Sequence, residues 1–344
     1  MNMKDTMITN GESKDLSHPP VSLVVLTWNG KHLLEECLPS VVLAAESYPG
    51  QAEIVVVDNG SVDRSVEYLR EAFPQVSLIP LHTNTGFPIC SNTGIRAARH
   101  DLVFLLNNDM FLEPDCIVPL VNDFTNEKVF AVGPLMLFPK SEVAIYSCSG
   151  VRFSRGRLKE DWAVTADGVD RCGRPSPTLY VSGGAMMFRR HIFEELGMFD
   201  TLYNPFNCED LDICYRAWKM GYHVLYEPGS IVYHKHQATI PKAFSRKYYA
   251  FINRRNKFLL MWRNLTDTGY FVRHIVLLIP HLFARILRGD TAELLAFLAA
   301  LRRARQIAQR RRREKNAYVR SDAEICEMLA LENLLSPDSM FESI

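Results

Sequence analysis

The chain has 344 residues, and its 39 basic and 39 acidic side chains give a formal net charge of +0 at pH 7. A hydrophobic content of 47% fits an ordinary soluble protein with a sizeable core and excludes a chain that is disordered throughout. The length suits one large domain with an appendage, or two modest domains. The overall charge balance hides a local excess, because seven arginines fall between Arg302 and Arg313.

The N-terminus and the cysteines lead to expectations about the surroundings of the protein. Residues 1–19 lack a periodic apolar pattern, and we expect a disordered tail there. The sequence opens without a signal peptide, and its eight cysteines include no CxxC pair. We therefore expect a cytoplasmic protein with reduced, mostly packed thiols.

Short apolar runs alternate with helical patterns from residue 21 onward. Buried strands are predicted at four such runs, residues 21–26, 53–57, 76–81 and 102–106. Helices are predicted over residues 31–47, where Pro39 should kink or split the helix, after Ser61 as an N-cap, and over residues 92–98. This repeated order indicates an α/β fold, in which helices cover a parallel sheet.

Polar side chains stand where these strands end. Thr27, Asp58, Asn84 and Asp109 follow successive strands, and the topology of a parallel sheet brings such ends to one edge. Asp109, with two asparagines directly before it, suits a hard divalent cation shared with substrate phosphates. An Asn/Asp turn without a ligand is the alternative. Neither GxGxxG nor GxxxxGK[ST] occurs, which disfavours a dinucleotide site or a P-loop.

Four motifs in this order resemble a known family. They are Val24-Val-Leu-Thr-Trp-Asn29, Val55-Val-Val-Asp-Asn-Gly-Ser61, Asn84-Thr-Gly-Phe87 with Asn92, and Leu105-Leu-Asn-Asn-Asp109. Together they are similar to the nucleotide-binding half of inverting family 2 glycosyltransferases, and most closely to the rhamnosyltransferase-like members. The resemblance covers residues 20–265. It implies a GT-A fold, which is a Rossmann-like mixed sheet flanked by helices. Beyond the resemblance, the pattern predicts a helical, Arg-rich region over residues 266–344.

The resemblance also implies roles for individual residues. Asp58 would hold the base or ribose of a nucleotide sugar, and Asp109 would be the metal ligand of the family's DXD motif. Asn107 stands where that motif has its first carboxylate, so a second protein ligand is needed. After Gly86 and Phe87, the loop is poorer in glycine than in relatives. The residues expected to bind the nucleotide sugar are Thr27, Asn29, Asp58, Asn84, Gly86, Phe87, Asn92, Asn107 and Asn108.

Two further segments complete the predicted site. Residues 180–188 are typical of a strand with a glycine pair, which permits close approach of a ligand or another backbone. Residues 207–212 contain three acids at the start of a helix, which could simply be favourable charges at a helix N-terminus. The resemblance implies that Asp210 is the general base. Glu209 would raise the pKa of Asp210 or orient the acceptor, and Asp212 is expected to cap the helix or face solvent.

Two short strands around a turn are predicted over residues 223–234, ending at His234. In the resembled family a histidine here helps to bind the metal, and His234 would supply the ligand that Asn107 cannot. Imidazole accepts Mn²⁺ better than Mg²⁺. A purely structural histidine is the alternative, and His236 is a weaker candidate for the same role.

The C-terminal part combines apolar helices with arginines. Residues 270–287 are apolar but interrupted by Arg273, Pro280 and Arg285, and the charge-free stretch is shorter than the ~20 residues of a spanning helix. A second apolar helix over residues 294–301 leads into the arginine cluster. This pattern favours a helix lying in an anionic membrane surface, with a helical cap on the catalytic domain as the alternative. Nucleic acid is disfavoured, because no recognised fold accompanies the arginines.

The sequence therefore predicts an inverting, metal-dependent glycosyltransferase. Its donor would be a nucleotide-diphosphate sugar linked to dTDP, UDP or GDP, with rhamnose as the sugar that the resemblance suggests. Its acceptor would be a glycan or a lipid-linked molecule, and the cofactor Mn²⁺ or Mg²⁺. We expect it in the cytoplasm, with peripheral contact to the inner face of a membrane. A non-catalytic sugar-nucleotide-binding protein and a membrane-docking scaffold are the alternatives.

Overall fold

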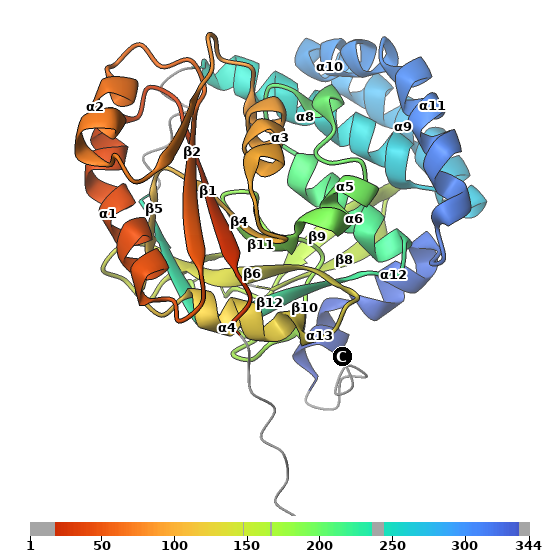
Figure 1. The fold of residues 1–344 in the computed structure, drawn as a ribbon. Coiled ribbons are helices and arrows are strands. Elements are labelled where there is room, and N and C mark those ends of the chain that lie inside the picture. The colour runs from red at the N-terminus through yellow and green to blue at the C-terminus, as the bar shows by residue number, and fades with distance from the viewer. Residues whose placement is uncertain (1–17, 147, 166, 236–243, 337–344) are drawn as a thin grey trace, which may run out of the picture.

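The computed structural model describes residues 18–146, 148–165, 167–235 and 244–336. Most of the predicted tail and His236 lie outside the described residues. Within them, the chain forms a mixed sheet with helices on both faces, and the C-terminal helices gather at one side of it (Figure 1). The predicted α/β fold with a mixed sheet and a C-terminal helical appendage is confirmed.

One mixed sheet organises the molecule. Its strands are β1 Val21–Thr27, β2 Ala52–Asp58, β3 Ser77–Pro80, β4 Leu102–Asn107, β5 Met110–Leu112, β6 Val129–Leu137, β7 Ala144–Tyr146, β10 Ser176–Pro177, β11 Ala185–Arg189 and β12 His223–His234. They lie in the order β10-β12-β6-β11-β4-β1-β2-β3, with β5 on β12 and β7 on β6. β1 is parallel to β2 and β4, whereas β11 is antiparallel to β4 and β6.

Helices cover both faces because the strands are apolar on both faces. They are α1 Lys31–Ser47, α2 Ser65–Ala72, α3 Phe87–Ala97, α4 Ile117–Asn122, α5 Arg190–Glu195 and α6 Glu209–Lys219. Successive side chains of a strand point to opposite faces. Accordingly, Val25 belongs to a core with Leu34 of α1, and Val24 belongs to another core with Ile95 of α3.

The first two helices differ from the prediction for local reasons. α1 continues through Pro39 without being split. α2 begins at Ser65, after Arg64, so the prediction of Ser61 as its N-cap is wrong. The Ser61 hydroxyl instead accepts a hydrogen bond from the Asn29 backbone N–H at 2.8 Å, which ties together the loops that follow β1 and β2.

Two predicted strand patterns are also revised. Of residues 180–188, only those from Ala185 onward form a strand, because the glycine pair before it sits in a turn. The two short strands predicted near residue 228 are one strand, β12, whose register shifts between Glu227 and Ile231. This irregularity lies where the turn was predicted, and the strand continues past it to His234.

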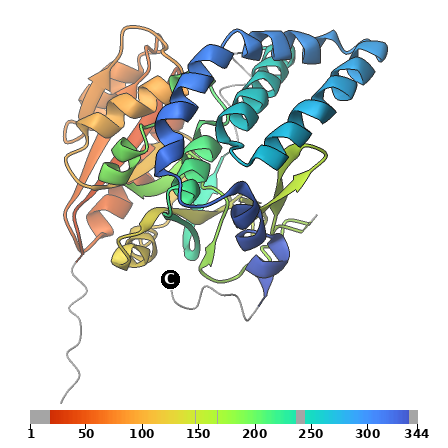
Figure 2. The same ribbon diagram turned by 90° about the vertical axis from the view of Figure 1, so that its right-hand side faces the viewer.

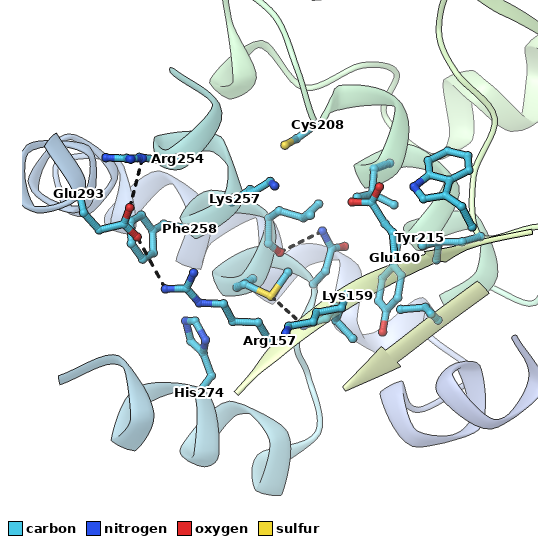
Figure 3. Close-up of a pocket in the computed structure, with 18 of the residues that line it drawn as sticks. Arg157, Lys159, Glu160, Cys208, Tyr215, Arg254, Lys257, Phe258, His274 and Glu293 are labelled. Atoms are coloured by element: carbon cyan, nitrogen blue, oxygen red, sulfur yellow. Dashed lines mark hydrogen bonds and ion pairs between the residues drawn. The ribbon is translucent and has the colours of Figure 1, made fainter. Parts of the chain in front are cut away.

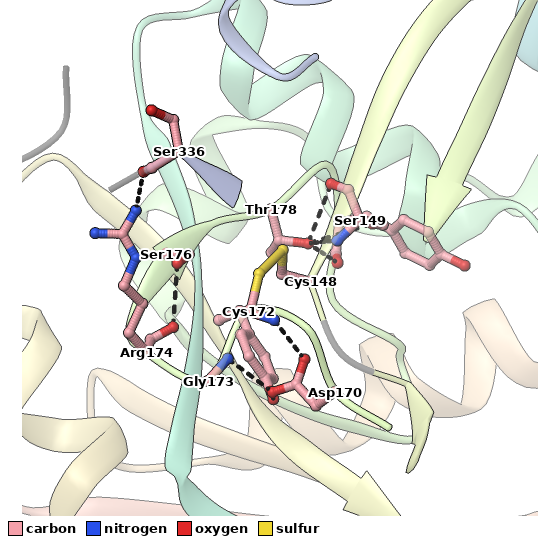
Figure 4. Close-up of a disulfide and its surroundings, with 11 residues drawn as sticks. Cys148, Ser149, Asp170, Cys172, Gly173, Arg174, Ser176, Thr178 and Ser336 are labelled. Carbon is pink, nitrogen blue, oxygen red and sulfur yellow. Dashed lines mark hydrogen bonds between the residues drawn. A yellow bond between two sulfur atoms is a disulfide. The ribbon is translucent and has the colours of Figure 1, made fainter. Parts of the chain in front are cut away.

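The segment after β7 forms a hairpin of β8 (Ser149–Ser154) and β9 (Arg157–Trp162) beside a disulfide. Cys148 and Cys172 are joined, and their Cα atoms lie 6.5 Å apart (Figure 4). The Cys172 N–H donates to Asp170 Oδ1 at 3.0 Å, which anchors the loop. The expectation of reduced thiols is wrong for this pair, because the fold brings together two cysteines that are 24 positions apart.

Six helices follow β12 within the described residues. They are α8 Arg246–Asn264, α9 Thr268–Leu287, α10 Thr291–Leu301, α11 Ala304–Glu314, α12 Asp322–Met328 and α13 Leu331–Leu335. Figure 2 shows α8 to α11 as a layer beside the sheet. The last two helices return to the sheet, where Ile325, Leu329 and Leu334 are buried in the same core as residues of its strands.

α9 is a helix of 20 residues that continues through Pro280. Among the described residues, it is the one helix long and apolar enough to cross a membrane by length and composition. Much of its apolar surface is uncovered, since Ile279, Phe283 and Leu287 are 69%, 61% and 72% exposed.

Candidate functional site

A cavity of about 360 Å³ lies at the edge of the sheet where β1 and β4 end. Aromatic side chains form much of its wall, namely Trp28, Phe87, Phe206, Phe244 and Tyr249. Polar side chains also line it, and they include the predicted residues Thr27, Asn84, Asn107, Asn108, Asp109 and His234. The strand ends therefore meet around one cavity, as the parallel topology predicts.

Hydrogen bonds between loops hold the polar wall in place. Asn108 Nδ2 donates to Thr27 Oγ1 at 2.8 Å, which links the ends of β4 and β1. Asn59 Nδ2 donates to Asn84 Oδ1 at 3.1 Å, and Asn59 Oδ1 accepts from the Thr85 N–H at 2.9 Å. These bonds join the loops after β2 and β3. The amides are thus oriented before any ligand binds, which reduces the entropy that a ligand has to overcome.

Gly86 and Phe87 begin α3 at the floor of the cavity. Gly86 has φ +85°, and a Cβ atom there would come within 2.1 Å of Asn204 Oδ1. The Phe87 N–H donates to the Pro205 carbonyl at 2.7 Å. Glycine is therefore required at position 86 both by its backbone angle and by the close approach of the Asn204 side chain.

Three of the predicted nucleotide-sugar residues lie behind the cavity wall. Asn29 Oδ1 accepts from the Val62 N–H at 2.8 Å. Asn92 is buried, and its side chain pairs with the Phe199 backbone. Asp58 is 1% exposed, and its Oδ1 accepts from the Ser61 N–H, whereas its buried Oδ2 makes no hydrogen bond to a described residue.

Asp109 and His234 meet across 125 positions of sequence. β5 pairs antiparallel with β12, and Met110 lies opposite His234 in that register. As a result, His234 Nε2 lies 3.1 Å from Asp109 Oδ2. Asp109 Oδ1 is buried without a hydrogen bond to a described residue. A carboxylate oxygen with spare acceptor capacity beside an imidazole is a donor set that fits a divalent cation.

Asp109 and His234 are a pair rather than a complete coordination shell. Within the described ranges, no group of three or more His, Cys, Asp or Glu residues is placed to hold a metal ion. Mg²⁺ and Mn²⁺ usually take only one or two carboxylates from the protein and use substrate phosphates as further ligands. The residues present therefore fit a cation that is shared with a phosphorylated ligand.

Asp210 is half-buried at the first turn of α6, and two backbone N–H groups hold its carboxylate. Gly183 donates to Oδ2 at 3.1 Å, and Leu211 donates to Oδ1 at 2.8 Å. Burial raises the pKa of Asp210, and these hydrogen bonds oppose the rise. Burial and the neighbouring Asp210 raise the pKa of Glu209 well above its usual range.

The predicted glycine pair connects Asp210 with the cavity. A Cβ atom at Gly183 would lie 3.2 Å from the Phe87 ring and 3.7 Å from the Asp210 Cβ. A Cβ atom at Gly184 would lie 3.0 Å from the Asn107 side chain. The glycines thus allow the ends of β4, α3 and α6 to approach closely, which places Asp210 next to the residues that line the cavity.

Asp212 neither caps α6 nor faces solvent, so that prediction is wrong. It is fully buried and accepts hydrogen bonds at 2.8 Å from Arg216, Tyr203 and Asn264. Arg263 Nε lies 3.5 Å from the same carboxylate. A buried ionised carboxylate requires such partners. Asp212 therefore fastens α6 to α8, and α6 differs in this respect from an ordinary surface helix.

Two residues of the arginine cluster, Arg310 and Arg311, also join the C-terminal helices to the rest of the described chain. Arg310 Nε lies 2.8 Å from Asp200 Oδ2, and Arg263 Nη2 lies 2.6 Å from Glu314 Oε1. Arg311 donates to the Trp262 carbonyl at 3.0 Å. The C-terminal helix α11 is therefore packed on α8 and on the segment around Asp200, as the alternative of a helical cap predicts.

A second cavity of about 530 Å³ lies between β9, α6 and the C-terminal helices (Figure 3). Cys208 and Leu211, which flank Glu209 and Asp210, form part of its wall. Sequence reasoning assigned no chemistry to β9, although three of its charged side chains line this cavity. The one signal for them is the high density of charged residues in this strand, which is also typical of an ordinary solvated strand.

The comparisons with known proteins agree with this geometry. A model of the family described as Glycosyl transferase family 2 matches residues 22–197. The chain is 24% identical over 242 residues to chondroitin synthase of Pasteurella multocida, an alignment of 62% of this chain and 24% of that protein. It is 27% identical over 241 residues to N-acetylglucosaminyl-diphospho-decaprenol L-rhamnosyltransferase of Mycobacterium tuberculosis, covering 63% of this chain and 76% of that protein. The chain thus spans about a quarter of the first relative.

Solved structures share the fold at low sequence identity. GalNAc-T7 with UDP, GalNAc and Mn²⁺ aligns with a TM-score of 0.54 at 18% identity, over 75% of this chain and 50% of that one. The mannosyltransferase PcManGT from Pyrobaculum calidifontis, in complex with GDP-Man and Mn²⁺, aligns with a TM-score of 0.52 at 18% identity, over 96% and 89%. With the family model matching more than half of its length, the chain belongs to glycosyl transferase family 2.

Proposed function

We propose that this glycosyltransferase inverts the anomeric carbon while it moves a sugar from a nucleotide diphosphate to an acceptor hydroxyl. Asp210 carries the proposal. The backbone N–H groups of Gly183 and Leu211 orient its carboxylate. Gly183 lies against Phe87 in the wall of the cavity at the ends of β1 and β4, which we call the strand-edge cavity, and Leu211 lines the second cavity. A donor in one cavity and an acceptor in the other would therefore meet beside this base.

The transfer is a single displacement. Asp210 takes the proton of the acceptor hydroxyl, whose oxygen forms a bond to the anomeric carbon. The bond from that carbon to the phosphate oxygen breaks, and its electron pair leaves with the nucleotide diphosphate. Attack from the face opposite the leaving group inverts the configuration. The raised pKa of Asp210 suits it to accept a proton near neutral pH.

The donor is assigned to the cavity at the strand ends. Trp28, Phe87 and Phe206 offer apolar faces for a base or sugar ring, and Asn107 and Asn108 offer amides for hydroxyl or phosphate oxygens. We further propose that the buried Asp58 Oδ2, which lacks a hydrogen bond to a described residue, reaches the nucleotide from behind this wall once the loop around Asn84 adjusts.

Asp109 and His234 would hold a divalent cation at this cavity, where the cation would neutralise charge on the departing diphosphate. Both solved structures named above contain Mn²⁺ with a nucleotide or nucleotide sugar, which supports this part of the proposal. The imidazole ligand favours Mn²⁺ over Mg²⁺.

The substrates are proposed from the relatives. The mycobacterial relative is named for L-rhamnose and for a lipid-linked diphospho-sugar acceptor, and we propose a deoxysugar donor and a glycan or lipid-linked acceptor of the cell envelope. The uncovered side of α9, with Ile279 and Phe283 at its centre, would rest on an anionic membrane surface. The protein would then work at the cytoplasmic face of that membrane.

Calorimetric titration of the purified protein with UDP, dTDP and GDP, each with Mn²⁺ or with EDTA, tests the donor assignment. We expect one nucleotide to bind in a Mn²⁺-dependent manner. Transfer from the matching sugar nucleotide, followed by NMR of the new linkage, should show inverted configuration. A retained configuration would refute the displacement. Absence of nucleotide binding would favour the membrane-docking scaffold, and binding without transfer would favour a non-catalytic binding protein.

A further inference from the structure

The second cavity is lined by an excess of basic side chains, which proton transfer at Asp210 does not require. Five basic side chains line it, against two carboxylates, Glu160 and Glu293. The basic residues come from β9, α8 and α9, and they are Arg157, Lys159, Arg254, Lys257 and Arg285. A concave, partly enclosed surface with an excess of one charge concentrates ligands of the opposite charge.

We infer that this cavity binds the phosphate or diphosphate group of a lipid-linked acceptor. The inference rests on the proposed transferase function, because it assigns the acceptor of the reaction at Asp210. Cys208 and Leu211 belong to the cavity wall and flank Glu209 and Asp210 in the chain. An acceptor anchored in the cavity by its phosphate would therefore have its sugar next to the base.

Some of the basic residues are already neutralised. Arg254 lies 2.9 Å from Asp290. It also lies 3.4 Å from Glu293 (Figure 3). Arg157 Nη2 is buried and lies 3.7 Å from Glu293 Oε1, which is too far for a hydrogen bond. Arg157 is therefore paired with Glu293 without a hydrogen bond through this nitrogen, and Arg254 mainly holds α8 and α10 together.

Lys159 and Lys257 supply the charge that remains. No ion pair within 4.0 Å joins either lysine to a carboxylate in the described part of the chain. The carboxylate that Lys257 influences electrostatically is Glu160, whose pKa is nevertheless raised, mainly by burial. Two lysines from different elements on one cavity, with a guanidinium nearby, are a suitable set of donors for a group with several phosphate oxygens.

Apolar surface next to the cavity favours a lipid as the source of the phosphate. Phe258 and Met261 line the cavity itself, and His274 of α9 closes one side, where its Nδ1 lies 2.7 Å from the Gly156 carbonyl. Leu260 adds to this apolar part of the wall, whereas the uncovered residues Ile279 and Phe283 lie on the side of α9 opposite His274. A diphosphate in the cavity could thus keep the first part of its lipid chain against the apolar wall, which a free pyrophosphate or a water-soluble glycan would not use.

The test measures binding of inorganic pyrophosphate, farnesyl diphosphate and farnesol to the full chain by calorimetry in EDTA, so that the metal-dependent donor site does not contribute. We expect farnesyl diphosphate to bind at least tenfold more tightly than pyrophosphate, and farnesol to bind weakly. The variant Lys159→Gln/Lys257→Gln should weaken farnesyl diphosphate binding at least tenfold. Lys315→Gln removes an exposed lysine outside the cavity and should change nothing.

Equal binding of farnesyl diphosphate to the double variant and the unaltered chain would overturn the inference, as would a lack of saturable binding to the unaltered chain. Equal affinities for the two diphosphates would contradict the lipid source and leave an anion site. Nucleotide binding with Mn²⁺ should remain unchanged in the double variant, with an unchanged melting temperature. If nucleotides fail to bind while farnesyl diphosphate binds, the proposed donor site fails and the lipid-diphosphate site stands.

Discussion

The two cavities beside Asp210 are built in different ways. The strand-edge cavity is lined by aromatic rings and by amides that neighbouring loops hold in place, and Asp109 is the one carboxylate among the described residues that line it. The second cavity is lined by charged side chains from a hairpin and three helices. The first follows from the topology of one sheet, whereas the second exists only because the C-terminal helices dock on α6. This contrast suggests that one cavity serves a nucleotide and the other a charged acceptor.

The largest expected effect concerns the residue between the two cavities. Asp210→Asn removes the base and should reduce the rate of sugar transfer about 10²- to 10⁴-fold, while nucleotide binding stays within a factor of two or so. Initial rates with radiolabelled donor and calorimetry with the nucleotide measure the two quantities. Because burial raises the pKa of Asp210, the rate for the unaltered chain should be lost as pH falls through a range above that of an ordinary aspartate.

Glu209→Gln is the matched control for this prediction. Burial and the charge of Asp210 raise the pKa of Glu209, so a neutral amide of the same shape should replace it with less than about a tenfold loss of rate. A loss for Glu209→Gln as large as that for Asp210→Asn would show that the roles of the two acids are misassigned.

The free energy of unfolding should depend on the buried ion pairs that hold α6 and α8 together beside the second cavity. Arg216→Met leaves the fully buried Asp212 carboxylate without its closest cation, which should cost about 3–5 kcal/mol of unfolding free energy. Urea denaturation followed by circular dichroism measures this loss. Arg70→Met, at an exposed position of α2, should stay within about 0.5 kcal/mol. Similar unfolding midpoints for the two variants would contradict a structural role for this network.

The strand-edge cavity should depend on the metal pair. Asp109→Asn should weaken Mn²⁺-dependent nucleotide binding roughly ten- to a hundredfold, because the carboxylate beside His234 is lost. In EDTA the variant and the unaltered chain should bind the nucleotide equally. Asn107→Asp adds a carboxylate on the same strand end and should strengthen Mn²⁺ binding, as measured by electron paramagnetic resonance. Unchanged metal dependence in both variants would place the cation elsewhere.

The smallest expected effect concerns the uncovered face of α9. Ile279→Ser/Phe283→Ser should weaken binding to vesicles with anionic lipid roughly tenfold, since each apolar side chain contributes only part of its transfer free energy at a membrane surface. Val62→Ser, at a position that is 88% exposed in a loop, is the control. Vesicle flotation compares the variants. Equal flotation of all three would remove the membrane from the proposed function.

Several features of the strand-edge cavity could be predicted from local sequence patterns. The apolar runs of β1 and β4 end in Thr27 and Asp109 because buried strands demand apolar residues and their exits tolerate polar ones. The order of strands and helices then brings these ends to one edge. Five residues of the predicted binding set, from Thr27 to Asn108, therefore line a single cavity, together with Gly86.

Contacts between distant segments were decided by the tertiary structure. The burial of Asp212 depends on Asn264 and Arg263 of α8, about fifty positions away, so its local setting at a helix start pointed to solvent. Likewise, Lys159 and Lys257 converge because a hairpin packs against α8. Cys148 and Cys172 pair because the loops on either side of β8 and β9 meet.

The sequence by itself determined the periodicities, and with them the α/β class, the positions of the strands and the polar residues at their ends. Only the tertiary structure decided which of those polar residues face a cavity, which are buried behind it, and which pair with distant residues. The physical reason is that periodicity depends on neighbouring residues, whereas burial and pairing depend on side chains that the fold brings from elsewhere.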